Sequence, residues 1–247
     1  MKRSNSVFAV ILALALTLFG SSAMAQITDL LKGFQTAAGG GGGSTLPDTT
    51  IADGLKEALA VGAGNAVEAV SRENGYFGNP QIKIPLPETV EKVVPVLRAV
   101  GYGDQVEAFD LSMNRAAEKA APMAKDMFID AIKQMSFEDA RNILNGPDNA
   151  ATLYLKEKTG PALGEAFKPI VRDSMATVGV TKAYQDLEAK ANAVPFGKMV
   201  SFDLDQYVTD KSLDGLFMVL GQEESKIRQD PAARVTDLLK TVFGNSG

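Results

Sequence analysis

Helical spacing of the apolar residues, sustained from about Thr50 to the C-terminus, most limits what this chain can fold into. Apolar side chains recur three and four positions apart, and alternating β-branched runs are almost absent. A half-buried sheet requires that alternation, because successive side chains of a strand point to opposite faces. The sequence therefore predicts an all-α fold, with a single multi-helix globular domain over residues 46–247.

Proline, glycine and helix-capping residues divide this pattern into separate expected helices. Ser136 and Asp148 are expected to cap helix starts, because short polar side chains accept hydrogen bonds from free backbone amides. Pro122 is expected to kink a long helix, and Gly160-Pro161 to separate two helices. The expected helices cover residues 53–71, 88–100, 104–135, 136–145, 149–158, 161–178, 181–193, 204–228 and 231–243.

The segment Ile82–Pro87 is expected to be extended. Pro85 and Pro87 each lack a backbone N–H donor and restrain the residue before them. We therefore expect a strap that lies along the helices without joining a sheet.

The first 25 residues have the layout of a bacterial secretory signal. A basic start precedes an apolar run from Val7 to Phe19, and small residues follow at Ala23 and Ala25. The run is shorter than the roughly 20 residues that a membrane-spanning helix needs. We expect cleavage after Ala25, a periplasmic location and no transmembrane anchor in the mature chain.

Residues 26–45 are expected to form a short amphipathic helix and a flexible linker. Ile27, Leu30 and Phe34 fall on one helix face, and the glycines from Gly39 to Gly43 follow. The sequence Thr-Asp-Leu-Leu-Lys occurs at residues 28–32 and again at 236–240. Two interpretations stay open: two amphipathic helices converged on similar residues, or the N-terminal or C-terminal helix mediates a homo-oligomer.

Composition excludes several functional classes. Without the signal, 23 Lys and Arg remain against 30 Asp and Glu, so the net charge is near −7 and a nucleic-acid partner is not expected. The chain has no His and no Cys, which excludes a Ser-His-Asp triad, a thiol nucleophile and an ordinary zinc site. No disulfide can form.

No cofactor or metal is expected from the motifs. The glycine run at 39–43 lacks the Lys and Ser or Thr of a phosphate-binding loop. Asp203, Asp205 and Asp214 look like a calcium loop at first sight, but the sixth position is Val208 where the turn requires Gly. We expect Asp203 and Asp205 to start a helix instead.

Several separated blocks carry a family resemblance. The blocks include residues 113–118, 128–132, 150–154, 213–217 and 230–234. They resemble, in the same order, an uncharacterised bacterial exported family catalogued as domain of unknown function 4197. The resemblance covers nearly everything after Thr50, and it implies an exported all-α fold without an assigned activity.

Charged and polar residues near these blocks supply the candidate site. Glu118 and Glu224 are weak candidates for catalysis, because glycoside cleavage uses a pair of carboxylates. The competing interpretation is structural, because charged pairs four residues apart usually stabilise a helix by about 0.2–0.5 kcal/mol. The weak candidates for ligand binding are Asn114, Arg115, Tyr154, Arg172, Arg228 and Arg234.

The expected function is a non-catalytic binding or interaction module of the cell envelope. Met113, Met123, Met127 and Phe128 either line a cavity for a small apolar ligand or fill an ordinary core. The alternative function is a carboxylate-dependent hydrolase acting on an envelope polymer, which requires Glu118 or Glu224 in a cleft with a second acid. A third is an oligomeric scaffold with an exposed apolar patch.

Overall fold

A computed structural model of the chain describes residues 48–92, 94–99, 101–177 and 203–229. Every regular element within these ranges is helical, which confirms the predicted all-α class. None of these helices is both long and apolar enough to cross a membrane. The expected signal, N-terminal helix and linker, the helices at 181–193 and 231–243, and Arg234 lie outside the described residues.

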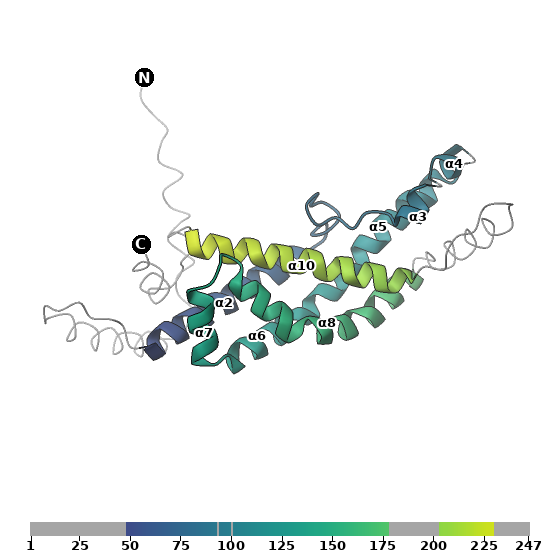
Figure 1. The fold of residues 1–247 in the computed structure, drawn as a ribbon. Helices are drawn as coiled ribbons and strands as arrows, with labels where there is room; N and C mark the ends of the chain where they lie inside the picture. The colour runs from purple at the N-terminus through teal and green to yellow at the C-terminus, as the bar shows by residue number, and fades with distance from the viewer. Residues whose placement is uncertain (1–47, 93, 100, 178–202, 230–247) are drawn as a thin grey trace, which may run out of the picture. The chain divides into compact units, whose positions relative to one another are not determined.

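Long helices form the main body, and shorter ones connect them (Figure 1). The long helices bury apolar faces against one another, as their spacing predicts. The long elements are α2 (Asp48–Ser71), α5 (Gly103–Ala120), α6 (Ala124–Gln134), α8 (Ala150–Thr177) and α10 (Leu204–Gln229); the short ones are α3 (Glu88–Glu91), α4 (Val94–Ala99), the 3₁₀ helix η1 (Ala121–Met123) and α7 (Phe137–Leu144).

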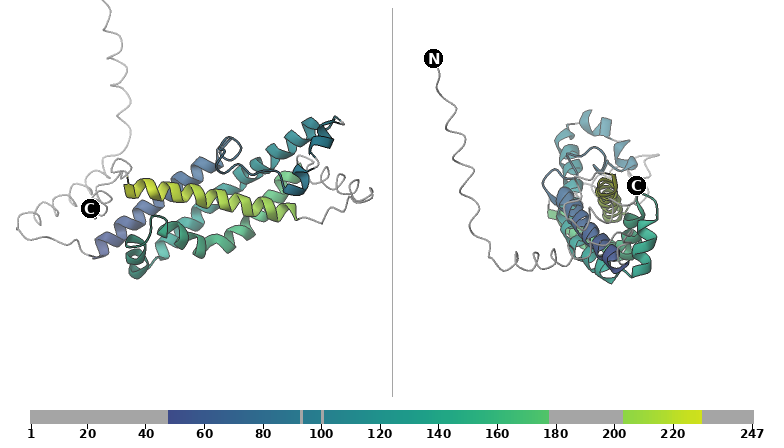
Figure 2. Two further views of the ribbon diagram at one scale, coloured as in Figure 1. Left: turned by 45° about the horizontal axis from the view of Figure 1, so that its top comes forward. Right: turned by 90° about the vertical axis from the view of Figure 1, so that its left-hand side faces the viewer.

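Helix α10 packs against α8, α2 and α5, so it contributes to most of the core. The right-hand view of Figure 2 shows α10 nearly end-on between α2 and α8. Phe217 of α10 meets Phe128 of α6 with ring centres 5.8 Å apart, and Leu216 and Leu155 are fully buried nearby in the same core. Most of the buried apolar residues of the described helices therefore form one large core, and Ala58 and Ile227 form a small separate cluster.

A stripe of alanines along α5 and α6 brings these helices close to their neighbours. Ala116, Ala117, Ala120, Ala121 and Ala124 are completely buried. Pro122 converts the single helix expected over 104–135 into α5, a 3₁₀ turn and α6, because its ring cannot continue the α-helical hydrogen bonding. The interruption occurs at Pro122, as predicted. It takes the form of a short 3₁₀ helix between two α-helices.

Helix α8 runs without interruption through the positions where the sequence predicted a break. Pro161 and Pro169 both lie inside it. Each proline removes a helix hydrogen bond and costs about 3 kcal/mol in a helix interior. Leu155, Leu163 and Phe167 are completely buried, since α8 packs along α5 and α10, and we infer that this burial offsets the cost. The prediction of two helices here was wrong.

In the segment before α5, prolines interrupt the regular structure, as expected. Lys83–Pro87 contain no regular helix or strand, so the strap joins no sheet, as predicted, while Ile82 lies in a turn. Ile82 and Ile84 bury their side chains in the core. The helix expected over 88–100 is divided into α3 and α4, and Pro95 is the second residue of α4. Proline is tolerated in the first turn of a helix, where its missing N–H has no intrahelical partner.

Candidate functional site

Glu118 on α5 accepts hydrogen bonds from two consecutive backbone amides. Its Oε1 is 3.0 Å from the nitrogen of Tyr76 and 3.2 Å from that of Phe77, and its Oε2 is 2.5 Å from Nη1 of Arg115. The residue is only 5% exposed. We call Glu118, Arg115 and the two amides the Glu118 clamp; it fixes the loop between α2 and the strap onto α5.

Arg115 extends the Glu118 clamp to the start of the same loop. Its Nη2 donates to Oε1 of Glu73 at 3.1 Å and to Oδ1 of Asn74 at 3.0 Å. Asn74 has φ of 62°, in the left-handed region that non-glycine residues seldom adopt. The guanidinium therefore holds a turn whose backbone is strained, while its other side neutralises the buried carboxylate.

Tyr76 anchors the loop to α10. The side chain is completely buried, and its hydroxyl donates to the backbone oxygen of Ser212 at 2.6 Å. Burial, and then the negative charge of Glu118, raises the pKa of this hydroxyl far above its usual value of 10.0. A Cβ on Gly215 would lie 2.6 Å from the Tyr76 ring, so only glycine lets α10 approach so closely.

Asn114 holds the strap by its backbone. Its Oδ1 accepts from the nitrogen of Ile84 at 2.8 Å, and its Nδ2 donates to the oxygen of Ile84 at 3.1 Å and to that of Asp110 at 2.9 Å. The Tyr207 hydroxyl donates to the oxygen of Pro85 at 3.1 Å. No strand lies beside the strap in the described part of the chain, so these side chains supply hydrogen bonds that a sheet would otherwise provide.

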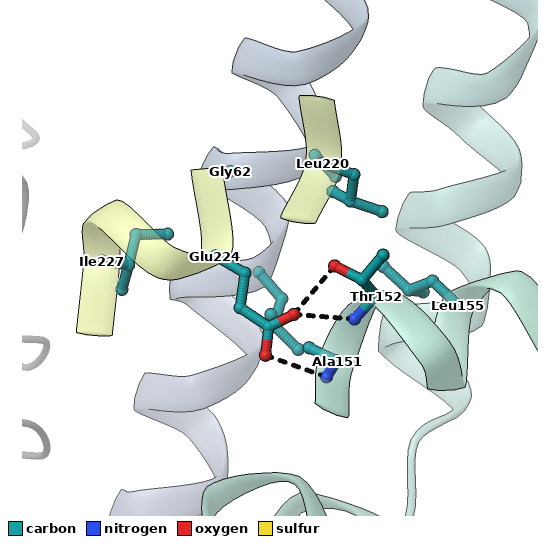
Figure 3. A pocket seen from close by; sticks show the side chains of 9 residues that line it. Gly62, Ala151, Thr152, Leu155, Leu220, Glu224 and Ile227 are labelled. Atoms are coloured by element: carbon teal, nitrogen blue, oxygen red, sulfur yellow. Dashed lines mark hydrogen bonds between the residues drawn. The ribbon is translucent and has the colours of Figure 1, made fainter. Parts of the chain in front are cut away.

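Glu224 on α10 makes a second clamp, at the start of α8 (Figure 3). Its Oε1 accepts from the nitrogen of Ala151 at 3.0 Å, and its Oε2 accepts from the nitrogen and the hydroxyl of Thr152, both at 2.8 Å. The amides at a helix start lack intrahelical partners, and a carboxylate there also meets the positive end of the helix dipole. Glu224 therefore caps α8 from a helix distant in sequence.

Arg228 completes the Glu224 clamp, which comprises Glu224, Arg228, the two amides and the Thr152 hydroxyl. Arg228 Nε and Nη2 lie 3.2 and 3.0 Å from Oε1 of Glu224, and Nη2 also donates to the oxygen of Ile143 at 2.8 Å. The apolar pocket beside Glu224 has a volume of about 10 Å³. That is near the smallest space that holds one water, so this pocket does not admit an organic ligand.

The two catalytic candidates are therefore placed in different structures. Glu118 binds a loop and Glu224 binds a helix start, and the pockets that Glu224 lines do not include Glu118. Both carboxylates are buried, and each has an arginine partner on its own helix. This arrangement gives both groups a complete structural role in the described part of the chain.

Tyr154 lines an open groove of about 500 Å³ between α6, α7 and α8. Met127, Ala131 and Ala162 supply apolar lining, and Asp130 and Lys158 supply charges. The Lys158 ammonium lies 5.6 Å from the centre of the Tyr154 ring, a cation–π contact. Burial, and then the negative charges of Asp139 and Glu157, raises the pKa of the Tyr154 hydroxyl.

The other described candidates for ligand binding, Asn114, Arg115, Arg172 and Arg228, do not line this groove. Arg172 is mostly exposed on α8 and lies 3.8 Å from Asp173. Of the expected cavity-lining residues, Met113 and Phe128 are completely buried in the core, Met123 is about half exposed, and Met127 lines the groove. These four side chains therefore lie in three different environments.

Asp203 and Asp205 lie at the start of α10, as expected. Asp203 Oδ1 accepts from the nitrogen of Gln206 at 2.9 Å, and this hydrogen bond, together with that from Lys168, lowers the pKa of Asp203. Asp214 lies further along the helix, 3.7 Å from Lys211. Within the described ranges, no group of three or more His, Cys, Asp or Glu side chains is arranged to hold a metal ion.

Sequence reasoning missed several residues that belong to the two clamps or pack beside them. Tyr76, Thr152, Ser212 and Gly215 all make contacts that depend on helices distant in sequence. The one signal available was that Thr152 and Gly215 fall inside the blocks that carry the family resemblance. Nothing local indicated the partner of either residue.

A family model described as "Protein of unknown function (DUF4197)" matches residues 45–244. The match includes both clamps and all of the described helices. Neither the curated proteins nor the solved structures contain a match to this chain.

Proposed function

The chain belongs to the DUF4197 family, and on that premise we propose that it is a non-catalytic binding or interaction protein of the cell envelope. The engagement of both buried carboxylates in backbone hydrogen bonds carries this proposal. A catalytic acid or base must reach a substrate, and a nucleophile needs a free lone pair. Glu118 and Glu224 instead point into the protein and bind its own amides.

Export rests on the N-terminal sequence. The basic start, the apolar run and the small residues before Ala25 are the features that export machinery and its peptidase recognise. The mature protein would then act in the periplasm, and its excess of acidic residues favours solubility there.

The groove beside Tyr154 is the proposed binding surface. Its volume of about 500 Å³ falls within the range of about 300–1,000 Å³ that is usual for ligand sites. Met127, Ala131 and Ala162 offer apolar contact, and a flexible methionine adapts to irregular ligands. A small ligand with an apolar body fits this lining, so a carrier role is the more specific form of the proposal.

Native mass spectrometry of the mature protein, purified from its own periplasm and then denatured, tests this proposal. We expect additional mass, or a defined oligomer, that is lost on denaturation. Met127→Asp changes the groove at a half-buried position and should reduce the retained mass, whereas Arg172→Gln on the exposed face of α8 should not.

The hydrolase alternative predicts a different outcome. It requires cleavage of an envelope polymer that is lost in Glu118→Gln or Glu224→Gln while the helical circular dichroism of the variant is retained. Such activity, together with bare monomeric mass, would overturn the binding proposal.

A further inference from the structure

The dipeptide Asn-Gly occurs twice in the chain, at 74–75 and at 145–146. In this dipeptide the side-chain amide can react with the following backbone nitrogen, because glycine has no side chain to obstruct the approach. Each pair lies next to one of the two clamps, so the structure compares the same chemistry in two settings.

Asn74-Gly75 is held on both reacting groups. Asn74 Oδ1 accepts from Arg115 at 3.0 Å, which fixes the amide carbon that would be attacked. The attacking nitrogen, that of Gly75, donates to the oxygen of Arg72 at 2.9 Å, and Gly75 is buried. A Cβ on Gly75 would lie 2.4 Å from the oxygen of Val70, so the end of α2 packs closely against this turn.

Asn145-Gly146 is held more weakly. Asn145 is exposed and ends α7, with φ of −88° and ψ of −1°. The Gly146 nitrogen donates to the oxygen of Ile143 at 3.2 Å, a hydrogen bond of the last turn of a helix, where ends fray. The arginine of the neighbouring clamp, Arg228, donates to that same Ile143 oxygen, and Glu224 binds the Ala151 amide beyond the turn, so this clamp holds residues that flank Asn145 and not the Asn145 side chain.

We infer that Asn145 is a site of spontaneous deamidation that the fold leaves open, and that the Glu118 clamp protects Asn74 from the same reaction. The Gly146 nitrogen loses its proton to solvent base and attacks Cγ of Asn145. The bond from Cγ to Nδ2 breaks, ammonia leaves, and a cyclic succinimide forms. Water then opens either carbonyl, so the net change is asparagine plus water to aspartate or isoaspartate plus ammonia.

Modification at Asn145 alters the turn that joins α7 to α8. The product carries a new carboxylate at the C-terminal end of α7, where the helix dipole disfavours negative charge. Isoaspartate also inserts one methylene into the backbone between the Ile143 oxygen that Arg228 binds and the amides that Glu224 binds. The Glu224 clamp is therefore the part of the molecule that this chemistry loosens first.

Peptide mapping by mass spectrometry tests the inference. The full-length protein is incubated in mildly alkaline buffer, and the amide-to-acid conversion and the isoaspartate content are followed at both sites. In the folded protein we expect conversion at Asn145 to exceed that at Asn74 by roughly tenfold or more, because a protected turn reacts only through local opening. The same protein in urea should convert both sites at similar rates.

Two variants keep the comparison decisive. Asn145→Gln should abolish conversion at that position and leave Asn74 unchanged. Arg115→Gln removes one of the two restraints on Asn74 and should raise its rate towards that of Asn145; the urea sample provides the reference if this variant unfolds. Equal rates in the folded protein, faster conversion at Asn74, or an unmodified Asn145 under conditions that convert it in urea would each overturn the inference.

Discussion

The Glu118 and Glu224 clamps use the same chemistry on two different kinds of structure. In each, a carboxylate that is 5% exposed accepts two consecutive backbone amides and pairs with an arginine of its own helix. The arginine lies three residues before Glu118 and four residues after Glu224, so both fall on the adjacent helix turn. The amides belong to an irregular loop in the first clamp and to the start of α8 in the second.

The difference teaches how each segment depends on its clamp. The loop before the strap has further attachments, through Tyr76 and Arg115, whereas the Ala151 and Thr152 amides at the start of α8 bind only Glu224 among the described contacts. The side chain of Arg228 is 13% exposed and that of Arg115 is 30% exposed, so the Glu224 clamp is also less accessible to solvent. We therefore expect the Glu224 clamp to be the more sensitive of the two.

Removal of either carboxylate should produce the largest effects. Glu224→Ala is expected to lower the free energy of unfolding by about 3–5 kcal/mol, because two buried amides and the Thr152 hydroxyl lose their acceptor and Arg228 loses its carboxylate partner. Glu118→Ala should cost less, since Arg115 keeps Glu73 and Asn74 as partners. Urea denaturation measures both values.

Glu157→Ala, on the exposed face of α8, is the matched control and should stay within about 0.5 kcal/mol of the wild type. A larger loss for Glu118→Ala than for Glu224→Ala would reverse the ranking of the two clamps.

Tyr76→Phe separates the loop anchor from the carboxylate beside it. Loss of the hydrogen bond to the Ser212 oxygen should cost about 0.5–1.5 kcal/mol at neutral pH, because this carbonyl stays within the α10 helix and loses only its second donor. Urea denaturation, compared with Tyr102→Phe on a half-exposed side chain, measures this cost.

The stability difference between the wild type and Tyr76→Phe should also depend on pH. Burial raises the pKa of the folded Tyr76 above 10.0, so the phenol stays protonated in the folded state while the unfolded chain ionises. Its contribution is complete below pH 10.0 and is lost above that value, by up to about 1.4 kcal/mol per pH unit. The gap between wild type and Tyr76→Phe should narrow as pH rises past 10.0; a constant gap would contradict the assigned role of the hydroxyl.

Ser136→Ala compares a local helix cap with the distant cap that Glu224 supplies. Ser136 Oγ accepts from the Asp139 nitrogen at 3.1 Å, and Asp139 accepts from the Ser136 nitrogen at 2.9 Å, which forms a capping box at α7. The variant should cost about 1 kcal/mol in thermal or urea unfolding, less than Glu224→Ala. Equal losses of stability in Ser136→Ala and Glu224→Ala would mean that burial of Glu224 does not strengthen its capping hydrogen bonds.

Glu73→Gln should have the smallest effect. Glu73 is mostly exposed and lies 3.1 Å from Arg115, at the outer edge of the Glu118 clamp. A solvent-exposed ion pair contributes less than about 1 kcal/mol, and salt screens it. Urea unfolding at low and high salt measures this contribution. A loss of stability comparable with that of Glu118→Ala would mean that the exposed Glu73–Arg115 pair contributes as much as the buried carboxylate.

Local signals predicted the parts of the fold that neighbouring residues decide. The helix cap at Ser136 and the absence of a helix or strand at Pro85 and Pro87 were predicted correctly, because turn and cap chemistry acts over three or four residues. The break at Pro161 was predicted from the same kind of signal and was wrong. Burial of Leu163 and Phe167 against distant helices outweighed the local preference of proline.

In the candidate site, too, local contacts were predicted and contacts between residues distant in sequence were not. The i, i+4 spacing of Glu224 and Arg228 predicted their contact, and the structure has it. The spacing did not predict that Glu224 caps α8 in the place expected for Asp148, or that Glu118 binds the loop amides of Tyr76 and Phe77. Those partners lie 73 and 42 residues away along the chain, and no local pattern encodes such pairs.

The sequence by itself determined the helical class, the principal helix ends and the range of available chemistry, because periodicity, proline and the absence of histidine and cysteine act without reference to distant residues. The tertiary structure decided what the two buried glutamates do. A carboxylate removed from water must bind whichever donors the packed helices bring to it, and here those donors are the backbone amides of a loop and of a helix start.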